Sequence, residues 1–139
     1  MRTTLNIDRY SGKPSYQQVI DGISQLIASG ALSADEKLPS VRALALDLSI
    51  NPNTIQKAYA ALDASGITYS VAGIGSFVAP DAAERIKVEG AAQLEALAAT
   101  LRDLALAHVD KEAVHQVVEE VWRDAHAEEQ SSHQKGKGE

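Results

Sequence analysis

The sequence contains no cysteine and few aromatic residues, and each scarcity narrows the range of functions. Without cysteine the chain can form no disulfide bond, thiolate metal site or cysteine nucleophile, and it is compatible with a reducing compartment. Because only 4% of its 139 residues are aromatic, we expect one modest core with an extension. There is no N-terminal apolar run of secretory length and no stretch of 18 apolar residues, so we expect a cytoplasmic protein that does not contact membrane.

The chain also lacks a positive charge excess, since its net charge is −6. The imbalance lies entirely beyond residue 80, because the bases and acids before that point cancel. They are Arg2, Arg9, Lys13, Lys37, Arg42 and Lys57 against Asp8, Asp21, Asp35, Glu36, Asp47 and Asp63. If any part of the chain faces nucleic-acid phosphate, it is therefore residues 1–80. Because this part has no net charge, a single copy of the chain should bind nucleic acid weakly.

Residues 38–62 carry the clearest pattern, which is two short helices separated by a tight turn. Apolar residues recur at helical spacing in both halves: Val41, Leu44, Ala45 and Leu48, then Ile55, Ala58, Tyr59 and Leu62. Ser40 and Asn51 are suitable N-caps, and Pro52 suits the first position of the second helix. Residues 49–51 then form the three-residue turn of a helix-turn-helix.

The polar face of the second helix indicates a function. With Ile55 directed inward, Asn53 and Lys57 point outward and Thr54 and Gln56 lie on the flanks. In DNA-binding proteins these N-terminal positions contact base edges in the major groove, where Asn, Gln and Lys find hydrogen-bonding partners. The alternative is an ordinary amphipathic helix pair whose polar face is solvated.

Arg42 lies near the amino end of the first of these helices, where it is placed to meet a DNA phosphate. The alternative for this residue is a surface ion pair with Asp35 or Glu36.

The flanking segments complete a winged helix. Residues 15–29 form a further helical stripe, and Leu5 and Ile7 alternate with polar neighbours as in a short edge strand. After Gly66 the periodicity changes to two, and Gly73 and Gly75 provide the turn of a hairpin over residues 67–78. A phosphate-binding glycine loop is disfavoured, since no GxGxxG is complete and no helix follows the glycines directly.

Two longer helices are expected beyond residue 80: the first is capped by Asp81 and runs to about residue 108, and the second is capped by Asp110 and runs to about residue 127. Gly90 is a weak point in the first. Their apolar stripes suit a dimer seam formed by Leu94, Leu97, Leu101, Leu104, Val114, Val118, Val121 and Trp122. Alternatively, the helices pack back on the winged domain. We therefore expect a mainly α protein with a small β wing. It divides into a winged helix-turn-helix domain (1–80), a two-helix dimerisation extension (81–127) and a disordered tail (128–139).

Catalysis and cofactors are not expected from these motifs. Glu112, His115 and Glu119 share one helical face, but exposed charge on an amphipathic helix explains them as well as a metal site would. We expect no metal, because only one of the three is a histidine. The sequence shows no nucleophile–base spacing and no complete phosphate loop, so an enzyme is disfavoured.

From residue 14 to residue 78 the sequence resembles the GntR-type bacterial transcription regulators, particularly their short YtrA-like branch. The resemblance covers PSYQQVIDGISQLIASG, LPSVRALALDLSINPNTIQKAYAALDASG and the wing-like GIGSFV. It implies a winged-helix domain that binds double-stranded operator DNA as a homodimer, with a short helical extension in place of a larger effector domain. It also implies a repressor acting on its own operon and on transporter genes, and a small-molecule effector is compatible with it.

The resemblance carries over to individual residues unevenly. Arg42 matches the arginine that begins the second helix of the domain, and Gly73 and Gly75 match the wing glycines. Other branches have arginines where this chain has Pro52 and Gln56, and basic residues around the wing are missing here. The expected DNA-contacting residues are therefore Arg42, Asn51, Asn53, Thr54, Gln56, Lys57, Gly73 and Gly75. The alternative function, favoured by the neutral wing, is a protein-binding adaptor without specific DNA binding.

Overall fold

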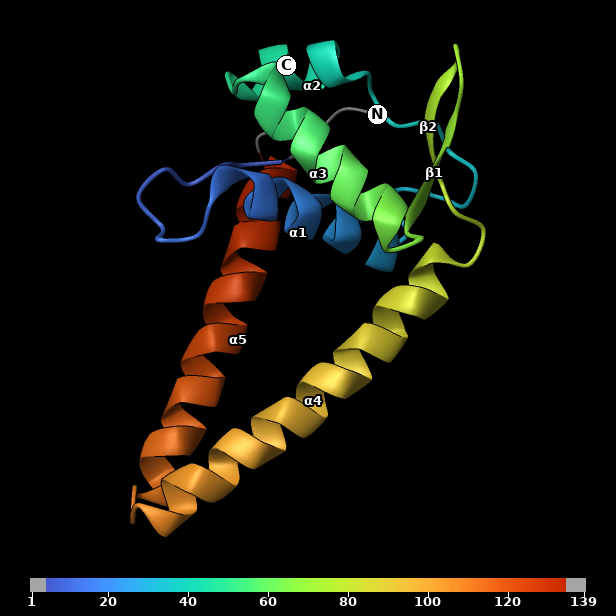
Figure 1. Cartoon of the computed structure of the whole chain (residues 1–139). Helices are drawn as coiled ribbons and strands as arrows, with labels where there is room; N and C mark the ends of the chain where they lie inside the picture. The colour runs from blue at the N-terminus through green and yellow to red at the C-terminus, as the bar shows by residue number, and fades with distance from the viewer. Residues whose placement is uncertain (1–4, 135–139) are drawn as a thin grey trace. The chain divides into compact units, whose positions relative to one another are not determined.

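A computed structural model describes residues 5–134, with side chains through residue 127. The elements are α1 (Ser15–Ala28), α2 (Val41–Leu48), α3 (Pro52–Ala64), β1 (Thr68–Val71), β2 (Gly75–Val78), α4 (Ala82–Leu106) and α5 (Lys111–Gln134) (Figure 1). The chain divides into two compact units, which we call the winged unit (Met1–Ala91) and the helical extension (Ala92–Glu139). This order confirms the predicted mainly α fold with a small β wing.

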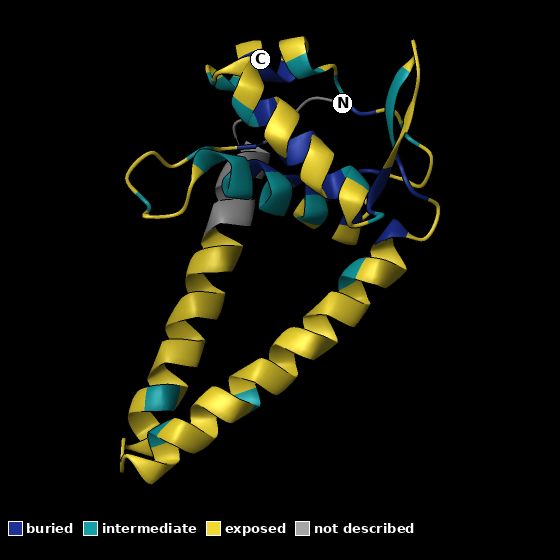
Figure 2. Cartoon of the chain, viewed as in Figure 1, coloured by how far each residue is buried: buried dark blue, intermediate teal, exposed yellow. Residues whose placement is uncertain are grey.

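The core of the winged unit forms where α3 packs against α1 and α2. Each helix buries the apolar face that its spacing predicted, and Figure 2 shows buried and exposed residues alternating along α3. The core residues that α1, α2 and α3 contribute are Val19, Ile23, Ile27, Leu44, Ala45, Ile55, Ala58, Tyr59 and Leu62. Burying each Val, Ile or Leu side chain stabilises a domain by roughly 1.5–3 kcal/mol, which fixes how α3 is rotated about its axis.

The wing is an antiparallel hairpin in which Thr68 lies opposite Val78 and Val71 lies opposite Gly75. The other edge of β2 is also hydrogen-bonded, because the Leu38 N–H donates to the Ser76 carbonyl at 2.8 Å and the Val78 N–H donates to the Glu36 carbonyl at 2.9 Å. The segment before α2 is therefore tied to the wing. Sequence periodicity missed this pairing because the segment is too short to show alternation.

The prediction of an edge strand around Leu5 and Ile7 is wrong, because the described residues 5–8 form no strand. Leu5 is buried against α1 instead. A Cβ placed on Gly22 would lie 2.0 Å from Leu5 Cδ2, so the leucine occupies the space that the glycine leaves open. Leu5 is therefore buried by contact with α1, so its apolar side chain needs no partner strand.

The boundary between the units lies about three helical turns beyond the expected division at residue 80. Ala82 is buried and Ile86 packs against the core, so the first turns of α4 belong to the winged unit. Asp81 was expected to cap α4, but its Oδ2 accepts from Arg85 Nε at 2.9 Å. The helix continues through Gly90 without a break.

In the helical extension, α4 ends at a tight turn and α5 begins at a capped N-terminus. His108 takes the left-handed conformation with φ 58°, which closes the end of α4. The Glu112 N–H donates to Asp110 Oδ1 at 3.2 Å, as the predicted cap requires. The helix α5 continues to Gln134, so residues 128–134, expected in a disordered tail, are helical. Residues 135–139 of that tail lie outside the described residues.

The apolar stripes of the extension are uncovered. Leu94 is 66% exposed and Trp122 is 62% exposed, and only Ala98, Leu104 and Val114 are half-buried between residues 92 and 127. Figure 2 shows exposed residues along almost the whole of both helices. Within the described residues, no helix combines the length and apolarity needed to cross a membrane.

Candidate nucleic-acid interface

The helix-turn-helix is closed by local hydrogen bonds at each position where the sequence predicted a cap. Ser40 Oγ accepts from the Ala43 N–H at 3.0 Å, and Asn51 Oδ1 accepts from the Asn53 N–H at 2.9 Å. Between the two helices Ser49 adopts a left-handed conformation with φ 53°. These bonds satisfy amides that would otherwise lack partners at the helix starts, so α3 begins at a defined point.

Buried residues on the opposite face hold α3 in place. Tyr59 donates its hydroxyl proton to the Pro39 carbonyl at 2.7 Å, which joins α3 to the segment before α2. Burial raises the pKa of Tyr59, since the phenolate would lose its hydration. The hydroxyl therefore remains a hydrogen-bond donor at neutral pH.

The amino-terminal half of α3 presents polar groups to solvent, as predicted. Asn51, Asn53, Gln56 and Lys57 are exposed and Thr54 is half-buried. Asn51 uses its oxygen for the cap, but its amide NH₂ group is not needed for that bond. The following exposed positions on α3 are small: Ala60, Ala61 and Ala64. A surface of this shape can approach a groove closely and donate or accept hydrogen bonds at its leading end.

Lys57 is exposed, but its ammonium group does not extend freely into solvent. Its Nζ lies 3.8 Å from the centre of the Tyr16 ring on α1, which is cation–π geometry. The predicted outward direction is confirmed by this exposure, but α1 contributes an aromatic partner that the helical wheel of α3 alone cannot reveal. Contact with a base or phosphate requires Lys57 to leave this ring, at a cost of roughly 0.5–1 kcal/mol for an exposed pair.

Arg42 does not form the surface ion pair that was the alternative to DNA contact. Within the described residues, its guanidinium has no ion pair with Asp35 or Glu36. Those carboxylates have other partners, since Asp35 accepts from the Tyr69 hydroxyl at 2.9 Å and Glu36 accepts from the Ser33 N–H at 2.9 Å. Arg42 is exposed on the first turn of α2.

The wing has an apolar tip. Gly73 adopts φ 77°, a conformation that an L-residue rarely takes, and the Ile74 N–H closes the turn on the Val71 carbonyl at 3.0 Å. Val71 and Ile74 are exposed at this turn, while the rings of Tyr69 and Phe77 stack at 5.5 Å further down the hairpin.

A basic side chain reaches the wing from outside the hairpin, which sequence reasoning missed. A Cβ on Gly75 would lie 3.0 Å from Lys37 Cε, so the Lys37 chain runs across that glycine. Lys37 is brought there by the pairing of its segment with β2. The wing therefore has a positive charge beside it, although its own residues are uncharged. No pattern within residues 67–78 could have predicted this contact.

Asp63, in the last turn of α3, connects this helix to the wing by hydrogen bonds. Its two carboxylate oxygens accept hydrogen bonds from the hydroxyl groups of Thr68 and Ser70 on β1. Ser70 also contacts Ser76 on β2, with 3.2 Å between the two hydroxyl oxygens. One carboxylate on α3 thus binds two hydroxyl groups of the wing.

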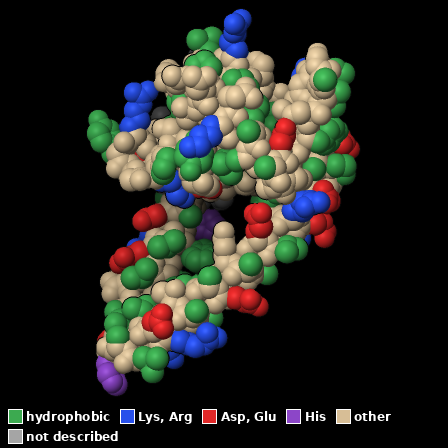
Figure 3. Space-filling view, viewed as in Figure 1, with side chains coloured by type: hydrophobic (Ala, Val, Ile, Leu, Met, Phe, Trp, Pro, Cys, Tyr) green, Lys and Arg blue, Asp and Glu red, His purple; other side chains and the backbone are tan. Residues whose placement is uncertain are grey.

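Charge is distributed differently in the two units. On the face drawn in Figure 3, Lys and Arg side chains are scattered over the winged unit, and Asp and Glu side chains are frequent along the long helices. This agrees with a balanced first part and an acidic remainder. On this face, the described residues form no dense basic patch of the kind that a strong nonspecific DNA binder carries.

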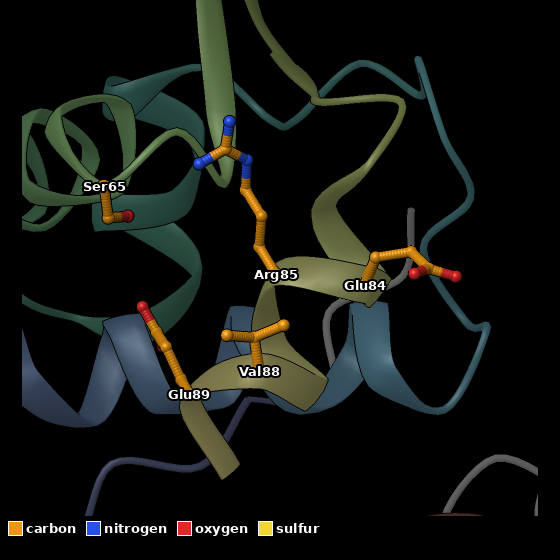
Figure 4. A pocket seen from close by; sticks show the side chains of 5 residues that line it. All are labelled: Ser65, Glu84, Arg85, Val88 and Glu89. Atoms are coloured by element: carbon orange, nitrogen blue, oxygen red, sulfur yellow. The ribbon is translucent and has the colours of Figure 1, made fainter. Parts of the chain in front are cut away.

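The winged unit also has a shallow pocket at the start of α4, lined by Ser65, Glu84, Arg85, Val88 and Glu89 (Figure 4). Arg85 turns toward the end of α3, and its Cζ lies 3.1 Å from where a Cβ on Gly66 would be. The same arginine is paired with Asp81. Because Arg85 already contacts both the end of α3 and the start of α4, we interpret this pocket as the packing junction between the two helices. Within the described residues, no group of three or more His, Asp or Glu side chains is arranged to hold a metal.

Three helices with a capped turn, followed by a hairpin, define a winged helix-turn-helix protein. The family model of the bacterial regulatory proteins of the gntR family matches residues 15–78. The transcriptional repressor YtrA of Bacillus subtilis is 34% identical over 122 residues, which cover 86% of this chain and 93% of that protein. The chain therefore belongs to the GntR family.

Solved structures agree with this assignment. A GntR family transcriptional regulator from Listeria monocytogenes is 34% identical and superposes with a TM-score of 0.64, covering 82% of this chain and 98% of that one. YtrA from Sulfolobus acidocaldarius, a GntR-family transcription factor, is 35% identical with a TM-score of 0.55, covering 68% of this chain and 97% of that one. The similarity thus extends beyond the winged unit into the helical extension.

Proposed function

We propose that this protein is a cytoplasmic, dimeric transcriptional repressor that binds double-stranded operator DNA through the winged unit. The observation that carries the proposal is the leading half of α3, where exposed amides stand on a helix fixed by a buried face. Asn53, Thr54 and Gln56 have the donors and acceptors that base edges in the major groove recognise. Lys57 joins them when it leaves the Tyr16 ring.

Other residues supply contacts to the DNA backbone in this proposal. Arg42 lies exposed at the start of α2, where a phosphate can also meet helix amides. Gly73 and Gly75 allow the wing to approach the duplex closely, and Lys37 beside Gly75 provides the charge that the hairpin itself lacks. Phosphate contacts of this kind fix the register in which α3 meets the bases.

Dimerisation through the helical extension is supported by its exposed apolar stripes. Leu94, Leu97 and Leu101 on α4 are uncovered, and so are Val118, Val121 and Trp122 on α5. Soluble proteins rarely leave so large an apolar surface without a partner. Half-buried Leu104 and Val114 lie in the same stripes. A second copy of the chain offers a surface of the same chemistry, as symmetric dimers require.

We propose repression because YtrA of Bacillus subtilis, which this chain matches over 93% of its length, is a transcriptional repressor. On the same ground we propose that the protein binds DNA and catalyses no reaction. The alternative is a protein-binding adaptor, which the exposed Val71 and Ile74 at the wing tip favour. A mobility shift separates the two functions. We expect the full chain to bind a duplex from upstream of its own gene more tightly than a scrambled duplex of equal length. Equal binding to both duplexes would refute sequence-specific regulation.

The dimer is tested by sedimentation. We expect the full chain to sediment as a dimer and a chain truncated after Ala91 to be folded and monomeric, because that cut keeps Ala82 and Ile86 in the core. A truncated chain that dimerises as tightly as the full chain would contradict the role of the extension.

A further inference from the structure

The loop before α1 is organised around the side chain of Gln18, which makes hydrogen bonds to several of its residues. Gln18 Oε1 accepts from the Asp8 N–H at 2.8 Å. Its Nε2 group lies 2.8 Å from the Asp8 carbonyl, 2.9 Å from the Lys13 carbonyl and 3.1 Å from Ser11 Oγ, in donor geometry to each. Asp8 also accepts from the Tyr10 N–H at 2.9 Å. Residues 8–13 are therefore organised before any partner binds, which lowers the entropic cost of binding.

This loop places an arginine at the helix-turn-helix. Arg9 Nη2 donates to the Ser49 carbonyl at 3.1 Å, and Ser49 is the left-handed residue between α2 and α3. The bond joins positions 40 residues apart and brings the guanidinium within two residues of Asn51, the cap of α3. It uses one of the five N–H groups of arginine. Arg9 itself is exposed, and the adjacent Tyr10 is 99% exposed.

We propose that Arg9, which the loop of residues 8–13 holds in place, contacts the sugar–phosphate backbone of DNA beside the groove that α3 enters. This rests on the proposed function. The guanidinium lies at the amino end of α3, which is the end that meets DNA in helix-turn-helix proteins and carries the positive pole of the helix dipole. It is bound to the turn rather than to α3, so it lies beside the base-contacting residues and fits the backbone rather than a base edge.

A phosphate contact by Arg9 would matter because the winged unit has little positive charge to spare. The winged unit has few cations, and Lys13 in the same loop is already paired with Asp21 at 2.7 Å. Because nearly all salt dependence of DNA binding comes from phosphate contacts, one additional contact changes the salt slope measurably. Arg9 in a merely structural role would fasten the loop to the turn without changing that slope.

The test uses the full chain and a fluorescent duplex from upstream of its own gene, titrated over a series of salt concentrations. Because a bound dimer carries two copies of Arg9, we expect Arg9→Ala to reduce the slope of log affinity against log salt by about 1.8 and to weaken binding about sixtyfold near 0.1 M salt. The loss should be similar on a scrambled duplex, because phosphate carries no sequence information. Arg9→Lys should restore most of the slope. Lys13→Ala, which removes a paired charge from the same loop, is the matched control and should leave the slope unchanged.

Two results would overturn the proposal. If Arg9→Ala keeps the wild-type slope, even with a lower melting temperature or affinity, Arg9 serves only to fasten the loop. If Lys13→Ala lowers the slope as much as Arg9→Ala does, the effect belongs to the net charge of the loop. A wild-type chain that binds neither duplex would refute the proposed function as well, which distinguishes the two failures.

Discussion

Replacing Asp63 with alanine should destabilise the winged unit and loosen the wing at the same time. The carboxylate accepts from the hydroxyl groups of Thr68 and Ser70, and Thr68 is only 3% exposed. Alanine would leave the Thr68 hydroxyl buried without this acceptor, a loss of roughly 1–3 kcal/mol. The Ser70 bond is exposed and adds less, so we expect a total of about 2–3 kcal/mol. A domain of this size would then melt roughly 8–24 °C lower.

The assay for Asp63→Ala is urea unfolding followed by far-UV circular dichroism, together with DNA titration. The midpoint should fall while the dependence of the unfolding free energy on urea stays the same. Ser70→Ala is the matched control, because it removes only the exposed bond and should cost less than half as much. An Asp63→Ala protein within 0.5 kcal/mol of the wild type would show that the carboxylate does not tie the wing to α3.

Two further substitutions test the recognition helix and its buried face. Lys57→Ala should weaken operator binding by roughly 1–3 kcal/mol, because a base contact is lost. It should lower the free energy of unfolding by only about 0.5–1 kcal/mol, because the contact with the Tyr16 ring is lost. DNA titration measures the first effect and thermal melting the second, and unchanged affinity would show that Lys57 does not contact DNA. Burial raises the pKa of Tyr59 above its ordinary value of 10.0, so folding favours the protonated phenol, and its stabilising contribution is present below pH 10 and lost as the pH rises further. A Tyr59→Phe protein should show a smaller loss of stability above pH 10 in melts at increasing pH, and identical pH profiles would contradict this assignment.

The sequence predicted the features of this fold that depend on neighbouring residues. The stripe from Ile55 to Leu62 and the caps Ser40 and Asn51 could be predicted because helix periodicity and capping act over a few residues. The hairpin followed from the change of periodicity after Gly66. The division of the chain was predicted less well, because the burial of Ala82 depends on the core it meets and not on its own helix.

The missed parts of the candidate interface all depend on contacts distant in sequence. Lys37 reaches Gly75 only because its segment pairs with β2, and Lys57 meets Tyr16 only because α1 packs on α3. Arg9 reaches Ser49 across the fold in the same way. A helical wheel assigns directions to residues on one helix but says nothing of which side chains arrive from elsewhere.

We propose that two chains, joined by their extensions, place two copies of α3 on one pseudo-palindromic duplex. Half-site centres would then lie about one helical turn apart, roughly 34–36 Å. Joining the copies makes the second contact effectively intramolecular, which compensates for the weak charge of a single winged unit. Leu97→Glu with Leu101→Glu should separate the chains while leaving the winged unit folded, because neither residue belongs to its core. Ala92→Glu with Ala99→Glu adds the same charge on the opposite face of α4 and serves as the control.

The most direct measurement is the titration of full-site and half-site duplexes at one fixed salt concentration, with the number of chains per duplex determined in each complex. We predict two chains on the full site, much weaker binding to the half-site, and loss of the full-site advantage in the Leu97 and Leu101 variant but not in the control. Equal affinity for the two duplexes, with one chain bound to each, would contradict the dimeric account.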